Sequence, residues 1–212
     1  MKPQVDKQHY EFTRYTGPDR WSSYYSQLCE TLALSPRDVL EIGPGDGFYG
    51  KCLSTISTIK YRSLDIDKEL NPDIVCSVLS IPLPDESVEC VVAFEILEHL
   101  PFDDFPIALK ELARVSSKNV ILSLPHFGPP VKVLIKLPFF SEMKLAFKIP
   151  YFRAHKFNGQ HYWEIGKLGY PVSRIITDIE QAFVVERHFI PFENQYHHFF
   201  ILTKRPKTKR GT

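Results

Sequence analysis

Residues 39–47 read VLEIGPGDG, a short apolar run with one acidic residue, followed by glycines at alternate positions. The apolar run predicts a buried parallel strand, and Gly43, Gly45 and Gly47 predict the turn that leads into a helix. Glycine adopts backbone angles closed to other residues and places no side chain between the turn and a ligand. Glu41 comes near the strand's end, where its carboxylate can point into the same crevice. A strand, a glycine turn and a helix N-terminus together form a nucleotide-sized site at the carboxyl edge of an α/β sheet.

The glycine spacing also allows a second interpretation. The spacing Gly45-x-Gly47-x-x-Gly50 also satisfies the GxGxxG pattern of dinucleotide-binding proteins. In that register the strand would run through Gly43 and Pro44, and proline is poorly tolerated inside a central strand. The register in which the turn begins at Gly43 is therefore favoured, and an NAD-dependent oxidoreductase stays as the alternative.

Length and composition fit one sizeable α/β domain over residues 1–212, with 43% apolar and 24% charged residues. The net charge of +1 argues against electrostatic binding of nucleic acid, so no nucleic-acid partner is expected. The cysteines, Cys29, Cys52, Cys76 and Cys90, form no CxxC pair and indicate buried thiols in a reducing compartment. We expect a cytoplasmic protein, since no signal peptide or run of 18 apolar residues is found, and we expect no bound metal ion.

Strands and helices alternate along most of the chain. Expected strands are 38–42, 60–65, 73–76, 88–95 and 119–125, and expected helices are 18–34, 47–57 and 105–115. A helix over 173–183 then precedes strands at 184–190 and 197–203, and the connection PFENQY is too short for a crossover helix. We predict an α/β fold: a Rossmann-like, doubly wound, seven-stranded, mostly parallel sheet with a C-terminal antiparallel hairpin and helices on both faces.

Three segments lie outside this alternation: an N-terminal arm and helix (1–34), a cap inserted after the fifth strand (126–170) and a basic tail (204–212). Within the cap, residues 129–157 hold six Lys/Arg and a single acid among many apolar residues.

Lysines in this cap recur four residues apart, at Lys132 and Lys136 and at Lys144 and Lys148, which predicts short helices with a basic and an apolar face. Three interpretations stay open: a lid packed on the domain, a surface for a membrane or for a lipophilic, anionic substrate, and a dimer contact. The protein is accordingly expected to be a monomer or a homodimer.

The run SVLSIPLPDESVECVVAFEILEHL, residues 77–100, adds a more specific signal to the glycine turn. Together they resemble the class I S-adenosylmethionine (SAM) methyltransferases of the type 11 kind, whose first motif is an acidic residue, one residue, then GxGxG. The resemblance implies that the cofactor is SAM and that the fold is the seven-stranded, mostly parallel sheet predicted above. Asp65, about twenty residues past the turn, is placed to accept the ribose hydroxyls. The full set of expected cofactor residues is Glu41, Gly43, Pro44, Gly45, Gly47, Asp65, Ile66, Ser77, Val78, Phe94, Glu95 and, from the arm, Tyr15.

Catalysis with SAM requires little more than alignment and removal of a proton. The candidate bases are His99 of the EHL motif, His126 directly after the fifth strand, and His161 of the GQHYWEIG stretch, because histidine titrates near neutral pH. No NPPY-type run follows the strand at 88–95, so we expect methyl transfer to oxygen or nitrogen of a small molecule rather than to a nucleobase or peptide amide. A SAM-binding interaction protein without activity is the alternative of a different class.

Overall fold

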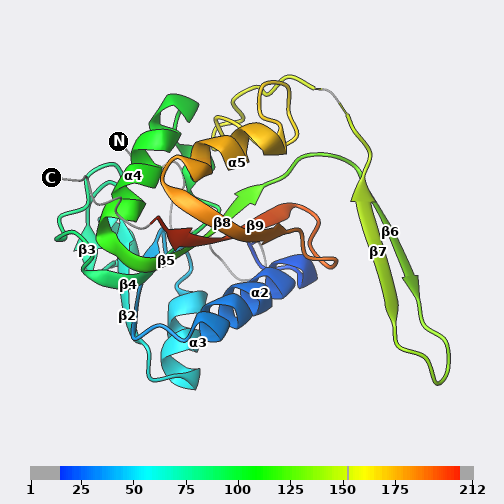
Figure 1. Ribbon diagram of the computed structural model, residues 1–212, viewed down its shortest axis with the longest axis horizontal. Helices are drawn as coiled ribbons and strands as arrows, with labels where there is room; N and C mark the ends of the chain where they lie inside the picture. Colours follow the sequence, from blue (N-terminus) through cyan, green and yellow to red (C-terminus); the bar gives the residue numbers. More distant parts are fainter. Residues whose placement is uncertain (1–14, 152, 206–212) are drawn as a thin grey trace, which may run out of the picture.

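A computed structural model describes residues 15–151 and 153–205 (Figure 1). Its main sheet has seven strands in the order β3 (Ile74–Val75), β2 (Lys60–Asp65), β1 (Asp38–Ile42), β4 (Val88–Phe94), β5 (Ser116–Pro125), β9 (His197–Lys204) and β8 (Phe183–Phe189). β3 to β5 pair in parallel, whereas β9 pairs antiparallel with both β5 and β8. The predicted fold, including its C-terminal antiparallel hairpin, is confirmed, and it differs from the 3-2-1-4-5-6 order of dinucleotide-binding domains.

Helices cover both faces of this sheet (Figure 1). Helices α4 (Phe105–Val115) and α5 (Val172–Glu180) lie on one face, and α2 (Pro18–Leu34) and α3 (Phe48–Ile56) on the other. Leu40 belongs to the core under α4 and α5, while its neighbour Val39 belongs to the core under α3. Successive side chains of a strand point to opposite faces, so burial on both sides explains the unbroken apolar runs in the sequence.

Several element boundaries follow from local sequence chemistry. Pro18 occupies the first helical position of α2 and Pro106 the first turn of α4, where a missing N–H costs nothing. Both helices begin and end as predicted. Short 3-10 helices fill the loops: η2 (Lys68–Leu70), η3 (Leu97–His99) and η4 (Phe102–Asp104).

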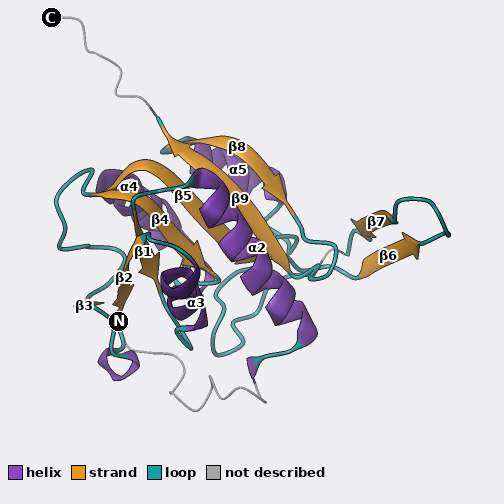
Figure 2. Ribbon diagram, turned by 90° about the horizontal axis from the view of Figure 1, so that it is seen from below, coloured by secondary structure: helices purple, strands orange, loops and turns teal. Residues whose placement is uncertain are grey.

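The helices predicted around the cap lysines are wrong. β6 (Pro130–Ile135) and β7 (Met143–Lys148) form an antiparallel hairpin that projects from the domain as an arm (Figures 1 and 2). A spacing of four is even, so it places residues on one face of a strand just as it does on one face of a helix. The β-branched residues Val131, Val133 and Ile135 favour the strand.

The rest of the predicted cap packs against the domain. Trp163 and Ile165 are fully buried, and the Trp163 indole N–H donates to Leu100 O at 3.2 Å. The aromatic rings of Phe102, Phe105 and Tyr170 surround Trp163. Segment 126–170 therefore consists of a projecting hairpin and a stretch that completes the core.

Residues 1–14 and 206–212 lie outside the described part, and with them most of the predicted arm and basic tail. In the part of the chain that the structure describes, no helix has the length and apolar character needed to span a membrane.

Candidate cofactor and acceptor site

The glycine turn after β1 has the backbone that its sequence predicts. Gly43, Gly45 and Gly47 have φ angles of +72°, +55° and +70°, a region that side chains disfavour. A Cβ at Gly43 would lie 2.0 Å from Ile96 Cδ1, so the turn packs tightly against the loop that follows β4. At Gly47, by contrast, a Cβ would find only Lys51 Cε, at 4.0 Å. The turn is thus closed on its Ile96 side and open at the start of α3.

Glu41 is buried under this turn, where the Tyr61 hydroxyl donates a hydrogen bond to its Oε2. A Cβ at Gly50 would lie 2.4 Å from the Tyr61 hydroxyl oxygen, so a glycine at that position makes room for the pair. Burial raises the pKa of Glu41 to about 8, and the hydrogen bond from Tyr61 opposes this rise. Glu41 therefore holds a proton at neutral pH and braces β1 against β2.

Asp65 and Ser77 mark the ends of β2 and β3 at the same edge of the sheet. Asp65 Oδ1 accepts the Asp67 amide at 2.7 Å, and Ser77 Oγ accepts the Leu79 amide at 3.2 Å. Burial raises the pKa of Asp65. Ile66 is half-buried and Val78 is buried beside them. The predicted ribose and adenine residues thus lie at, or directly after, the carboxyl ends of two neighbouring strands.

Glu95, directly after β4, has a φ of +56°, which is unusual for a residue with a side chain. Its amide donates to Ser123 O at 3.0 Å, and its Oε2 lies 3.7 Å from His197 Nε2. Burial raises the pKa of Glu95 to about 8. Strained backbone of this kind clusters at functional sites. Phe94, in contrast, packs into the core against Tyr49 and Phe199.

Tyr15 lies next to Arg20, whose guanidinium carbon is 4.0 Å from the centre of the Tyr15 ring and whose Nη1 donates to the Tyr15 hydroxyl at 2.9 Å. Burial raises the pKa of Tyr15 to about 12. The charge of Arg20 lowers the pKa of Glu95, in opposition to burial, which places this cation near the end of β4. Arg20 was not among the cofactor residues predicted from the sequence; its place in the first turn of the predicted helix 18–34 was the available signal.

The three candidate bases separate into two groups. His99 and His161 lie together, with ring centres 5.1 Å apart. His126 lies elsewhere, with its Nδ1 3.1 Å from His198 Nδ1, and His198 Nε2 lies 2.9 Å from His188 Nδ1. Burial lowers the pKa of His126 to about 4, so this imidazole is neutral at pH 7.

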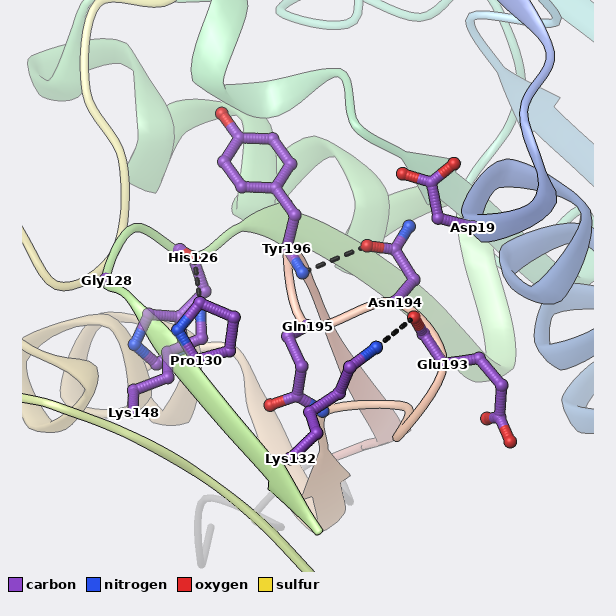
Figure 3. Close-up of a pocket in the computed structure, with 10 residues that line it drawn as sticks. All are labelled: Asp19, His126, Gly128, Pro130, Lys132, Lys148, Glu193, Asn194, Gln195 and Tyr196. Atoms are coloured by element: carbon purple, nitrogen blue, oxygen red, sulfur yellow. Dashed lines mark hydrogen bonds between the residues drawn. The ribbon is translucent and has the colours of Figure 1, made fainter. Parts of the chain in front are cut away.

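A cavity of about 330 Å³ opens beside His126, between the hairpin and the loop that joins β8 to β9 (Figure 3). Lys148 Nζ donates to the His126 carbonyl, and Lys132 Nζ donates to Glu193 O at 3.2 Å. Burial lowers the pKa of Lys148 to about 8. The remaining lining residues are Asp19, Gly128, Pro130, Asn194, Gln195 and Tyr196. Lys132 and Lys148 thus face the domain and the cavity.

Comparison with known proteins agrees with this geometry. Residues 40–124 match the family model described as a methyltransferase domain. No match was found among curated proteins. The matched methyltransferase domain, the sheet order and the glycine turn together support a class I SAM-dependent methyltransferase, and SAM is the cofactor of that family.

Solved structures with this fold include a SAM-dependent methyltransferase from Aquifex aeolicus (TM-score 0.61, 16% identity, 95% of this chain and 100% of that one). Another is the Burkholderia thailandensis 1,6-didemethyltoxoflavin-N1-methyltransferase with bound 1,6-didemethyltoxoflavin and S-adenosylhomocysteine (TM-score 0.64, 11% identity, 94% of this chain and 85% of that one). A third is the N-methyltransferase NodS from Bradyrhizobium japonicum WM9 with S-adenosylhomocysteine (TM-score 0.60, 10% identity, 91% of this chain and 90% of that one). At these identities the likeness concerns the fold.

Proposed function

We propose that this methyltransferase transfers a methyl group to oxygen or nitrogen of a small, negatively charged acceptor. The observation that carries the proposal is the cavity beside His126, because it lies past the carboxyl end of β5 and is lined by Lys132 and Lys148. Ligands of open α/β sheets bind outside the carboxyl ends of the strands.

The cofactor half of the site is proposed to use the residues around the glycine turn. Gly43, Pro44, Gly45 and Gly47 would lie under the methionine and ribose portions, since the open space at Gly47 fits a ligand approaching the backbone. Asp65 and Ile66 would hold the ribose, and Ser77 and Val78 the adenine. Glu95, Tyr15 and Arg20 would surround the methionine end, where Arg20 supplies a positive charge for its carboxylate.

In the acceptor half, Lys132 and Lys148 would attract an anionic group, while Asn194 and Gln195 provide hydrogen-bonding groups at the cavity wall. The SAM sulfonium, when bound, supplies an activated methyl group. The protein then has to align the acceptor and take its proton. The neutral His126 lines the cavity and is the proposed proton acceptor there, with His99 and His161 as the second candidate pair.

The outer face of the hairpin supports a second proposed partner, an anionic membrane surface. Paired side chains on this face are all apolar and mostly exposed: Val131, Val133, Ile135, Met143, Leu145 and Phe147. Phe139 and Phe140 are exposed at the tip. An isolated two-stranded hairpin is only marginally stable in water, so this face is suited to a covering surface. The excess of basic residues over 129–157 favours anionic lipid as that surface.

Incubation of the purified protein with SAM carrying a labelled methyl group and a panel of small carboxylates, phosphates, phenols and amines tests the proposed activity. We expect label in an anionic acceptor and a large loss of rate in Lys148→Gln. Tight SAM binding without product across the panel would instead support the inactive interaction protein.

A further inference from the structure

A second feature of the carboxyl edge is a buried carboxylate that makes no hydrogen bond to any other residue the structure describes. The Glu98 side chain is fully buried, and neither of its carboxylate oxygens has a hydrogen-bond partner on any other described residue. Buried polar groups are almost always paired, because an unpaired one loses the hydrogen bonds it made to water. The Glu98 carboxylate is therefore open to a ligand that would supply the missing interaction.

Two histidines converge on this carboxylate. His161 Nε2 lies 4.0 Å from Glu98 Oε1, and one ligand atom each from Glu98, His99 and His161 lie within 4.8 Å of one another. The backbone fixes the arrangement, since the Tyr162 amide donates to Glu98 O at 2.9 Å. Residues far apart in the sequence are thus held around one point.

Both imidazoles are oriented by their other ring nitrogen. His99 Nδ1 lies 3.1 Å from Gln160 O, and a carbonyl only accepts, so this nitrogen donates the hydrogen bond that orients the ring. His161 Nδ1 lies 3.1 Å from Glu164 Oε1, and the Tyr196 hydroxyl donates to the same oxygen at 3.0 Å. Histidines that ligate metals characteristically donate their second N–H to a carbonyl or carboxylate in this way.

We propose that Glu98, His99 and His161 bind a divalent transition-metal ion of the Zn²⁺ type. Two imidazole nitrogens and one carboxylate suit such an ion better than Ca²⁺ or Mg²⁺, which prefer oxygen ligands. Bonds of about 2.0–2.2 Å require the donor atoms to draw closer together on binding than the separations of up to 4.8 Å seen here. This proposal departs from the sequence-based expectation of no bound metal ion, which considered the cysteines alone.

Three protein ligands leave room for a further ligand on the ion. A water molecule would take this position. The metal site does not depend on the proposed function, because its ligands are complete without SAM or acceptor.

The test is a calorimetric titration of the full chain with Zn²⁺, after treatment with EDTA and dialysis, in the absence of SAM. Co²⁺ titration followed by visible absorption gives a second measurement and shows whether cysteine thiolates take part. The variants are Glu98→Gln and His161→Gln for the ligands, Glu164→Gln for the orienting carboxylate, and His188→Gln as the matched control outside the cluster.

We expect one Zn²⁺ per wild-type and His188→Gln chain, with a raised melting temperature on binding. Glu98→Gln and His161→Gln should lose this site while keeping their circular dichroism spectra, and Glu164→Gln should bind about 10- to 100-fold more weakly. Absence of stoichiometric binding to the wild type, or binding unchanged in the two ligand variants, would overturn the proposal. Because no SAM is present, failure of the methyl-transfer proposal leaves this result unaffected.

Discussion

Substitution of Gly43 by alanine tests the packing of the glycine turn in isolation. The added Cβ would lie 2.0 Å from Ile96 Cδ1 and 2.5 Å from Ile96 Cγ1, far inside van der Waals contact. The residue would also have to keep a φ of +72°, at a cost of about 1–2 kcal/mol. Overpacking typically adds about 1–3 kcal/mol. We therefore expect Gly43→Ala to lower the free energy of unfolding by about 2–5 kcal/mol.

Gly159 provides the matched control, because it also has a positive φ (+96°) but nothing within 4 Å of a built Cβ. Gly159→Ala should therefore show the conformational cost alone, about 1–2 kcal/mol. Ile96→Ala combined with Gly43→Ala removes the clash, so the double variant should lose less than the sum of the two single variants.

Denaturant unfolding of the wild type and of the four variants, with SAM titration of each, gives both measurements. Gly43→Ala should also bind SAM more weakly, while Gly159→Ala should bind it as the wild type does. Equal stability of Gly43→Ala and Gly159→Ala, or no coupling with Ile96→Ala, would refute the close packing of the turn on the β4 loop.

Three further results are expected. The ordinary pKa of a glutamate is 4.5, and that of Glu41 in the folded protein is about 8, so between these pH values the folded protein holds a proton that the unfolded chain releases. Glu41 therefore makes the free energy of unfolding fall as pH rises through this range. Glu41→Gln should flatten this pH dependence in melting curves, and an unchanged slope would contradict the raised pKa. Arg20→Gln should weaken SAM binding in calorimetry by about tenfold, from loss of a charge-assisted contact, and unchanged affinity would remove Arg20 from the methionine site. The protein should sediment with anionic vesicles, and the sedimented fraction should fall as salt rises. Phe139→Asp should lower that fraction, while the control Tyr25→Asp on α2 should not. Absence of sedimentation, together with a mass that depends on concentration in light scattering, would assign the hairpin to a dimer.

Much of the fold could be predicted from local sequence. Helix α2 and strands β1 and β2 have the predicted boundaries, because apolar periodicity and a first-turn proline are local signals. The β6–β7 hairpin could not be distinguished from a pair of short helices in this way, since the spacing of Lys132 and Lys136 suits both a strand and a helix.

The site was predicted less completely than the fold. The glycine turn and Asp65 are local features and lie where the sequence placed them. Contacts such as Tyr61 with Glu41, or His161 with Glu98, join residues that the sequence separates, and no pattern in a single sequence signals them. The burial of Trp163 likewise follows from its packing partners rather than from its own surroundings in the sequence.

Calorimetric titration of the full chain with SAM and, separately, with NAD⁺ is the most direct measurement of how the glycine turn is used. One SAM should bind per chain, NAD⁺ should not bind, and Asp65→Asn should weaken SAM binding because the ribose hydroxyls lose a charged acceptor. Binding of NAD⁺ without SAM, or SAM binding indifferent to both Asp65→Asn and Gly43→Ala, would contradict a cofactor site at the carboxyl ends of β1 and β2.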